Sequence, residues 1–284
     1  MPIQWFPGHM AKAKREVQEK LKLVDFVIEL VDARVPLSSQ NPLLQQLLNN
    51  KTKMIVLMKN DLADNKITTK WLSYFETKGI VSIAIDVNNK KDIQTVIQTA
   101  KMLAEEKMER LRRKGIRPRA ARAMIVGIPN VGKSTLINRL ANKKIAKTGD
   151  RPGVTKQQQW IKVKKDFELL DTPGILWPKF EDEVVGLRLA AIGTIKDQLL
   201  PMDEIATFIL RYIQSNYPSI MKERYEVEEE LTDIVGIFTK IGKRRGCLEA
   251  GGHVNFDKTA EIIVQDLRNS RLGPISLEHP TNEE

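Results

Sequence analysis

The sequence AMIVGIPNVGKSTLINRL, residues 123–140, decides the fold class. An apolar run typical of a buried strand leads into Gly127-Ile-Pro-Asn-Val-Gly132-Lys133-Ser134, and an amphipathic stretch follows. This loop fits the pattern G-x-x-x-x-G-K-[ST], in which backbone N–H groups and the positive end of the next helix enclose phosphate groups. We therefore expect a phosphate-binding loop between a strand and a helix.

Individual roles follow from the chemistry of these side chains. The Lys133 ammonium would neutralise the outer phosphate oxygens, and the Ser134 hydroxyl would ligate Mg²⁺. The loop residues expected to contact the nucleotide are Asn130, Val131, Gly132, Lys133, Ser134 and Thr135.

A second motif, Asp171-Thr-Pro-Gly174, directly follows the strand-like FELL. A carboxylate at a strand end can hold Mg²⁺, and the Gly174 N–H can bind the terminal phosphate. Between the two motifs, the loop Arg151-Pro-Gly-Val-Thr155 could bring the Thr155 hydroxyl to the same Mg²⁺. Lys133, Thr155 and Gly174 are the residues of these motifs that we expect to act in catalysis.

A base-reading segment, Met58-Lys59-Asn60-Asp61, ends the apolar run at 54–58. Asp61 can accept two hydrogen bonds from the N1–H and 2-amino groups of guanine, a pattern that adenine does not present. Lys59 would lie over the base with its aliphatic stem. A second base contact is expected after the strand at 80–85, at Asp86 and Val87. Together with the phosphate loop, these residues indicate a GTPase.

The order of elements predicts an α/β domain followed by an all-α domain. The expected strands are 26–31, 54–58, 80–85, 123–127, 160–163 and 167–170, and the expected helices between them are 42–49, 69–78, 93–113 and 133–142. Mostly continuous apolar runs favour a doubly wound, largely parallel sheet, and the pair at 160–170 favours an edge hairpin. Further helices are expected at 182–199, 203–214, 227–241 and 257–271. We predict domains at 1–177, with a basic segment at 1–22, and 178–277, followed by a frayed tail at 278–284.

Composition limits the class of protein. The 284 residues are 42% hydrophobic and 29% charged, which excludes wholesale disorder, and the formal net charge of +10 favours a polyanionic partner. Cys247 is the single cysteine, and no signal peptide or bilayer-spanning run is found. These features predict a cytoplasmic protein without membrane association, which we expect to be monomeric.

The order of the motifs is unusual for a GTPase. The base-reading segment (58–61) precedes the phosphate loop (127–134), the reverse of Ras-like proteins and the mark of circularly permuted GTPases. The segments IQWFPGHMAKA (3–13), DARVP (32–36), GIPNVGKSTLIN (127–138) and LLDTPGILWPKFED (169–182) resemble the ribosome biogenesis GTPase A family along nearly the whole chain. The resemblance implies GTP and GDP binding with Mg²⁺, and action on the large ribosomal subunit in late maturation with release after hydrolysis.

The chain departs from related GTPases at two positions. The family has asparagine where this chain has Met58, and a thioether cannot replace the bonds of that amide, so we expect guanine preference with weaker affinity. Ras-like enzymes orient water with a Gln after the DxxG glycine, where this chain has Ile175, so intrinsic hydrolysis should be slow. His9, in WFPGH, is the candidate replacement, although it could equally be bystander surface. Asn130 resembles the asparagine of potassium-activated GTPases, or is simply a turn residue.

Basic residues suggest RNA rather than DNA as the partner. One cluster lies at 107–122, which holds eight Lys or Arg and one acid. The others are Lys12, Lys14 and Arg15, then Lys240, Lys243, Arg244, Arg245, Arg268 and Arg271. Such residues could bind ribosomal RNA phosphates, or could be solvated helix ends. An RNA-binding protein with a degenerate, structural nucleotide site is the alternative to a GTPase.

Overall fold

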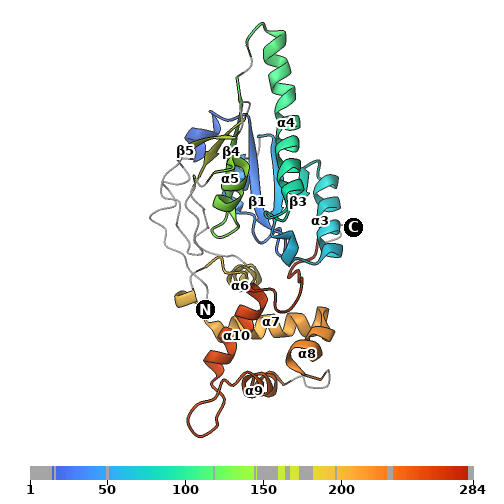
Figure 1. The fold of residues 1–284 in the computed structure, drawn as a ribbon, viewed down its shortest axis with the longest axis vertical. Coiled ribbons are helices and arrows are strands. Elements are labelled where there is room, and N and C mark those ends of the chain that lie inside the picture. The colour runs from blue at the N-terminus through green and yellow to red at the C-terminus, as the bar shows by residue number, and fades with distance from the viewer. Residues whose placement is uncertain are drawn as a thin grey trace. The chain divides into compact units, whose positions relative to one another are not determined.

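The computed structural model describes residues 15, 17–48, 51–117, 119–143, 145, 159–163, 167–172, 182–195, 197–228 and 233–280. The chain divides into two compact units (Figure 1). One unit comprises residues 1–181 together with 278–284, and the other comprises residues 182–277.

A six-stranded sheet forms the core of the first unit, with the strand order β3-β2-β1-β4-β6-β5. Its strands are β1 (Phe26–Asp32), β2 (Lys53–Met58), β3 (Val81–Ala84), β4 (Ala121–Gly127), β5 (Gln159–Val163) and β6 (Phe167–Asp171). Neighbouring strands pair in parallel except β5, which pairs antiparallel with β6. β1 is buried along its whole length, as expected for a central strand covered on both faces. The predicted doubly wound sheet and its edge hairpin are confirmed.

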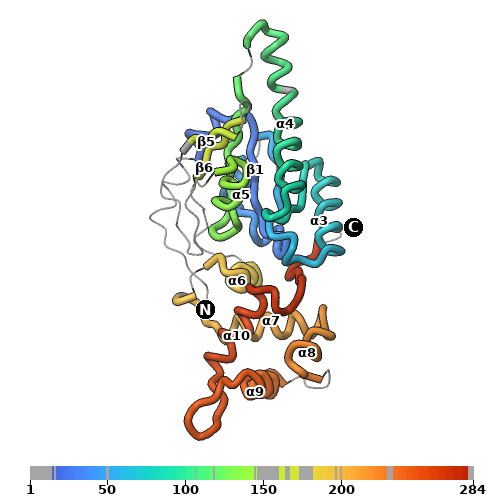
Figure 2. The backbone as a smooth tube through the Cα atoms, viewed as in Figure 1, coloured from blue at the N-terminus to red at the C-terminus, as the bar shows by residue number. Residues whose placement is uncertain are grey.

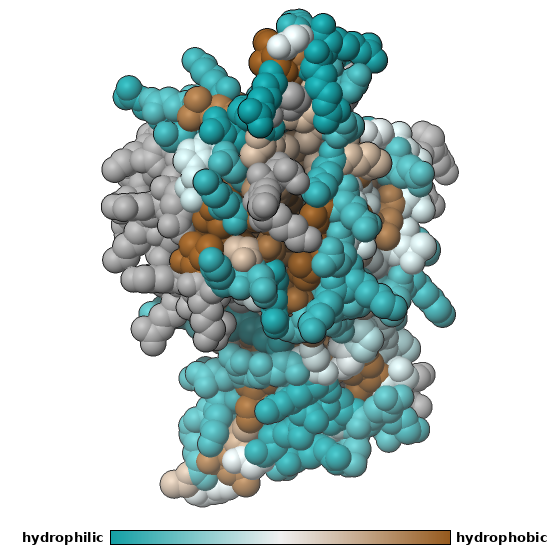
Figure 3. All heavy atoms as spheres, turned by 45° about the horizontal axis from the view of Figure 1, so that its top comes forward, coloured by the Kyte–Doolittle hydropathy of each residue, from teal (hydrophilic) through white to brown (hydrophobic). Residues whose placement is uncertain are grey.

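Helices cover both faces of the sheet. α2 (Pro42–Leu48) and α3 (Asn65–Thr77) pack on the face that carries Val27 and Val31. α4 (Lys90–Arg113) and α5 (Lys133–Ala141) contact β4 and each other on the opposite face. α4 extends beyond the sheet, and the surface at its far end is mostly hydrophilic (Figures 1 and 3).

The second unit is helical, as the sequence predicted. It contains α6 (Glu183–Ala191), the short 3₁₀ helix η2 (Asp197–Leu199), α7 (Met202–Asn216), α8 (Pro218–Tyr225), α9 (Ile234–Arg244) and α10 (Phe256–Arg268). α10 contacts α6, α7 and α9, and its buried residues include Ala260, Ile263 and Val264. Its apolar stripe therefore forms the centre of this unit.

Three helix predictions in this unit need correction. The expected helix at 182–199 ends at Ala191, and Gly193 then adopts a φ of 81°. α8 was not among the expected helices, although Pro218 lies at its first turn, where proline begins a helix readily. The helix expected at 227–241 instead begins at Ile234, where the Asp233 carboxylate accepts hydrogen bonds from two backbone N–H groups.

The end of the chain is not the frayed tail that the sequence suggested, at least through Glu278. The Glu278 carboxylate is buried and accepts hydrogen bonds from the Leu37 N–H at 2.8 Å and the Ser38 hydroxyl at 2.6 Å. Its carbonyl accepts a bond from Trp71 Nε1 at 3.1 Å. The red end of the tube in Figure 2 accordingly lies beside α3. These bonds hold Glu278 in the first unit.

A buried carboxylate ties the end of α4 to the start of β1. Asp25 lies 2.6 Å from Lys107 and 2.8 Å from Arg119, and it also accepts the Arg122 backbone N–H. Burial alone would raise the pKa of Asp25, but these donors and charges outweigh it and hold the pKa below its usual value. Asp25 therefore contributes stability while it is ionised.

Asp25→Asn is expected to lower the free energy of unfolding by about 1–3 kcal/mol at pH 7, because two cations lose their partner. A folded-state pKa below the unfolded value gives stability that is complete above about pH 4 and is lost as the pH falls through the folded pKa. Chemical denaturation from pH 7 to pH 3 should show the two proteins converging. The exposed Glu76→Gln should differ little from the parent, and a constant Asp25→Asn deficit at all pH values would contradict the prediction.

Within the described ranges, no helix combines the length and apolar character needed to cross a bilayer.

Candidate nucleotide-binding site

Four strands bring the motifs together at one edge of the sheet. Asp32 of β1 is in register with Met58 of β2, Leu30 with Gly127 of β4, and Ile125 with Asp171 of β6. Because these strands are parallel, their carboxyl ends meet at the same edge, where ligands of open α/β sheets bind. Segments separated by more than a hundred residues thereby form one site.

The phosphate loop lies between β4 and α5, as its sequence predicted. Gly132 caps α5 with a φ of 101°, a conformation that a side chain would strain, and Asn130 is left-handed with a φ of 59°. A Cβ at Gly127 would lie 2.9 Å from the Leu30 carbonyl oxygen, so this glycine permits the close approach of β4 and β1. The left-handed turn gives Asn130 a structural reason to be asparagine, independent of any cation.

Lys133 and Asp171 form a buried pair at the centre of the site. Their side chains are 7% and 1% exposed, with Nζ 4.0 Å from Oδ1, and Lys133 Nζ also donates to the Thr172 carbonyl. Burial lowers the pKa of Lys133 to about 8, and burial raises the pKa of Asp171, while each opposes the other's shift.

Both Asp171 oxygens are buried and lack a hydrogen-bond partner within the described part of the chain. Unpartnered buried carboxylate oxygens are costly, and oxygen ligands of this kind suit Mg²⁺ and its bound water. The residues present therefore fit a magnesium–phosphate group. Ser134 lies at the start of α5 and is half-buried, and its role as a ligand of the same ion stays a prediction.

The base-reading segment forms a short 3₁₀ turn after β2, Asn60–Leu62. The Asn60 N–H donates to the Ile85 carbonyl at 3.1 Å, which brings Asp61 toward Asp86. Burial, and then the nearby Asp86 charge, raise the pKa of the Asp61 carboxyl. Two carboxylates in such proximity are suited to a ligand that donates hydrogen bonds, as guanine does.

Met58 contacts the phosphate loop directly. A Cβ built on Gly132 would lie 3.0 Å from Met58 Cε, and Met58 is 1% exposed. The thioether therefore fills the space between the base-reading segment and the phosphate loop, without the hydrogen bonds of an amide.

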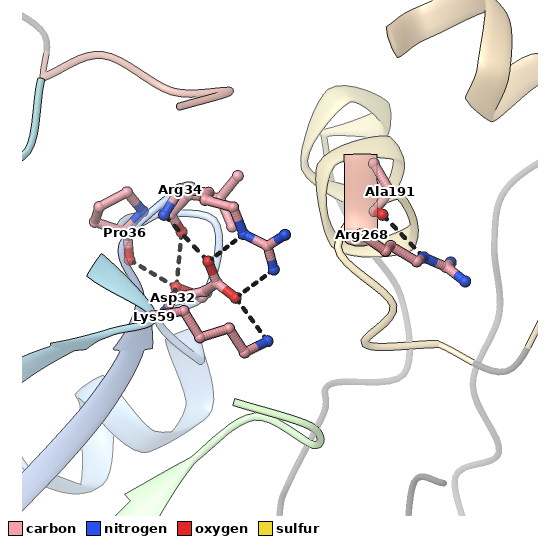
Figure 4. A network of polar contacts seen from close by, with 8 residues as sticks. Asp32, Arg34, Pro36, Lys59, Ala191 and Arg268 are labelled. Carbon is pink, nitrogen blue, oxygen red and sulfur yellow. Dashed lines mark hydrogen bonds and ion pairs between the residues drawn. The ribbon is translucent and has the colours of Figure 1, made fainter. Parts of the chain in front are cut away.

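Sequence reasoning missed the ion cluster beneath the base-reading segment. Asp32 accepts two hydrogen bonds from the Arg34 guanidinium, both at 2.8 Å, and lies 3.0 Å from Lys59 Nζ (Figure 4). Asp32 and Arg34 belong to the DARVP segment, which was used only as a family signature. An apolar, buried strand that ends in the charged pair of Asp32-x-Arg34 could have indicated this ion cluster.

Several predicted site residues lie outside the described residues. They are His9, Thr155 and Gly174, together with Ile175 and Lys12 and Lys14 of the basic N-terminal segment. Of the described ones, Val131 is buried, and Thr135 and Val87 are half-buried beside the phosphate and base-reading segments. Their roles stay predictions.

The structure shows which of the predicted RNA-binding cations are already paired with carboxylates or carbonyls of the chain. Five of the eight at 107–122 form ion pairs with carboxylates: Lys107, Arg112, Arg113, Arg119 and Arg122. Arg268 donates to the Ala190 and Ala191 carbonyls and to Asp197, and its side chain is 14% exposed (Figure 4). Its assignment to an RNA surface is wrong, since these bonds join the last helix to α6.

A second carboxylate organises the other cations of the helical unit. Asp266 is fully buried and accepts two hydrogen bonds from Arg224, at 3.0 and 2.8 Å. Arg245 and Arg271 also lie within 4 Å of it. Three guanidinium groups around one carboxylate leave a net positive charge there, with Arg271 the most exposed at 59%.

Comparisons with known proteins agree with the motifs. The sequence profile of the 50S ribosome-binding GTPase family matches residues 122–240. Ribosome biogenesis GTPase A of Bacillus licheniformis is 57% identical over 280 residues, covering 99% of each chain. Mitochondrial ribosome-associated GTPase 1 of Bos taurus is 33% identical, covering 97% of this chain and 88% of its own.

Two solved structures of YlqF from Thermotoga maritima resemble the whole fold. The GDP-bound form gives a TM-score of 0.67 at 26% identity, covering 94% of this chain and 99% of that one. The GNP-bound form gives 0.66 at the same identity, covering 95% and 98%. The likeness extends over both the sheet and the helical unit.

Proposed function

The chain belongs to the ribosome biogenesis GTPase A family and hydrolyses GTP, and from this premise we propose that it docks on the large ribosomal subunit during late maturation and leaves after hydrolysis. Membership of this family establishes that the chain has a guanine-nucleotide site and acts in ribosome biogenesis. The docking partner, the order of events and the residue roles are the substance of the proposal.

The buried Lys133–Asp171 pair at the carboxyl edge of the sheet supports the nucleotide-dependent part of the proposal. Lys133 would neutralise the β- and γ-phosphate oxygens, and the Gly174 N–H would bind the γ-phosphate. Ser134, Thr155 and Asp171 would hold Mg²⁺, directly or through water, and the ion would neutralise charge that develops on the phosphates. The chain contributes the position of each group in a site shielded from water.

We expect slow intrinsic hydrolysis because of the residue that follows the DxxG glycine in the sequence. Ile175 cannot polarise water, so we assign that role to His9, whose neutral imidazole could orient the attacking water near pH 7. Asn130 would help hold K⁺ against the phosphates. Both assignments need the ribosome-bound state to be tested, because we expect the large subunit to complete the catalytic arrangement.

The helical unit and the projecting end of α4 are the proposed RNA-binding surfaces. The net positive cluster around Asp266, with Lys240, Lys243 and Arg244 nearby in sequence, suits the ribosomal RNA backbone. Such contacts are read by shape and weaken steeply with salt. We propose a cytoplasmic monomer with no DNA or membrane partner.

Steady-state GTP hydrolysis in potassium buffer, with and without purified large subunits, tests the proposal. We expect strong stimulation by large subunits, none by small subunits, and loss of stimulation as salt rises. Replacement of K⁺ by Na⁺ should slow the reaction if Asn130 holds the cation. A rate that large subunits leave unchanged would overturn the docking proposal and point to another activator.

A further inference from the structure

An ion cluster joins Lys59 of the base-reading segment to Asp32 and Arg34, two residues that the chemistry described above does not use. Asp32 is completely buried, the Arg34 side chain is 2% exposed, and the Lys59 side chain is 26% exposed. Three charged groups in such a place cost desolvation free energy, and apolar side chains of similar volume would often be as stable. Stability alone is therefore a weak reason for the cluster.

The cluster acts on the backbone of the base-reading segment. Lys59 is left-handed, with φ 59° and ψ 40°, a conformation that costs about 1–2 kcal/mol for a side-chain-bearing residue and persists only where its surroundings impose it. Its ammonium is held 3.0 Å from Asp32, and the Met58 carbonyl accepts the Ala33 N–H at 2.8 Å. The DARVP turn thus holds the Met58 carbonyl and the end of the Lys59 side chain.

Arg34 in turn fixes Asp32. Its Nε and Nη2 donate to the two carboxylate oxygens and its backbone N–H donates to Oδ1 at 3.1 Å, while the Asp32 N–H donates to Ser39 Oγ at 3.0 Å. Only a planar, forked donor can make this pair of bonds, so lysine would not replace arginine. Arg34 Nη1 is buried and, within the described residues, has no hydrogen-bond partner.

Arg34 also acts on Asp61 through its charge. Burial and the charges of Asp86 and Asp32 raise the pKa of Asp61, and the positive charge of Arg34 opposes that rise. A carboxylate that accepts two hydrogen bonds from guanine must be ionised, so the guanidinium favours the form that reads the base. Asp32 itself stays ionised, because the Arg34 and Lys59 charges outweigh its burial and lower its pKa.

This chain depends on the cluster more than a relative with asparagine at position 58 would. The Met58 side chain packs on Gly132, but a thioether contact has no preferred direction. It therefore limits how closely the base-reading segment approaches the phosphate loop without fixing the orientation of that segment. The bonds from residues 32 and 33 instead go to the Lys59 ammonium and the Met58 carbonyl.

We propose that Arg34 and Asp32 are positioning residues for guanine recognition, which set the conformation of Lys59 and thereby the position of Asp61, two residues further along the chain. The proposal rests on base reading by Asp61. Neither side chain is required to touch the nucleotide.

The test compares GDP with IDP, which lacks the 2-amino group that Asp61 is expected to bind. In the parent protein we expect GDP to bind roughly 10- to 100-fold more tightly than IDP, the worth of one charge-assisted hydrogen bond. Arg34→Lys should reduce this ratio by about fivefold to tenfold, as expected for residues of one network. Fluorescence competition against a labelled nucleotide measures both affinities.

A matched control is Arg224→Lys, which breaks an equivalent two-bond pair with a buried aspartate, Asp266, in the helical unit. It should lower stability and leave the GDP/IDP ratio unchanged. If Arg34→Lys fails to fold, Ser39→Ala removes the acceptor of the Asp32 N–H while keeping every charge, and should reduce the ratio by about twofold to threefold.

The outcomes distinguish base reading by Asp61 from the positioning role of Arg34 and Asp32. A parent protein that binds GDP and IDP equally would refute base reading by Asp61. A parent that discriminates, with Arg34→Lys or Ser39→Ala retaining the full ratio, would overturn the positioning role and leave base reading intact. A fall in the ratio that Arg224→Lys also produces would show a general effect of stability and would likewise refute the positioning role.

Discussion

Lys133→Ala is expected to reduce GTP hydrolysis on the order of 10²- to 10³-fold, both alone and with large ribosomal subunits. The Lys133 ammonium is 7% exposed and is aimed into the site between Asp171 and the Thr172 carbonyl. Its burial means that water cannot substitute for the lost charge on the phosphates. Single-turnover hydrolysis at saturating protein measures the loss without relying on nucleotide affinity.

Folding must be checked in the same experiment, because Lys133→Ala removes the charge that faces a buried carboxylate. Thermal unfolding with and without GDP provides that check. Lys70→Ala, on the exposed side of α3, is the matched control and should hydrolyse GTP at the parent rate. A folded Lys133→Ala protein that retains half of its activity would contradict the role given to this side chain.

Asp61→Asn is expected to reverse base specificity, from guanine to xanthine nucleotides. The carboxylate accepts from N1–H and the 2-amino group, whereas an amide can donate to the carbonyl that xanthine has at C2. Two charge-assisted hydrogen bonds are worth about 1.5–3 kcal/mol each, so the GTP/XTP affinity ratio should change by about 10²- to 10⁴-fold. Competition binding with GTP, XTP and ATP measures the change.

Asp64→Asn provides a control three residues away. Asp64 caps α3 by accepting the Lys66 and Ile67 N–H groups, and asparagine caps helices equally well. This variant should keep both stability and the preference for GTP. Unchanged preference in Asp61→Asn would show that another group, such as Asp86, reads the base.

The patterns that predicted the fold were local ones. Continuous apolar runs identified the strands, and the phosphate-loop sequence placed one strand before a helix, because a left-handed Gly132 and a helix at Lys133 are properties of that short segment. The errors in the predicted helices also arose locally, from residues that can either end or begin a helix. Pro218 ends one helix and begins the next, and Asp233 was hidden inside a stretch interpreted as continuous helix.

The sequence by itself determined which chemical groups are present: the phosphate loop, the aspartate proposed to read the base, the permuted order of motifs and the family. Tertiary structure alone decided which of those groups meet. It paired Lys133 with Asp171, placed Met58 on Gly132, and bonded Arg268 to the Ala190 carbonyl and Lys107 to Asp25. It also joined Asp32 and Arg34 to Lys59. The physical reason is that spacing along a chain fixes contacts within a helix or turn, whereas contacts between segments depend on strand register and burial.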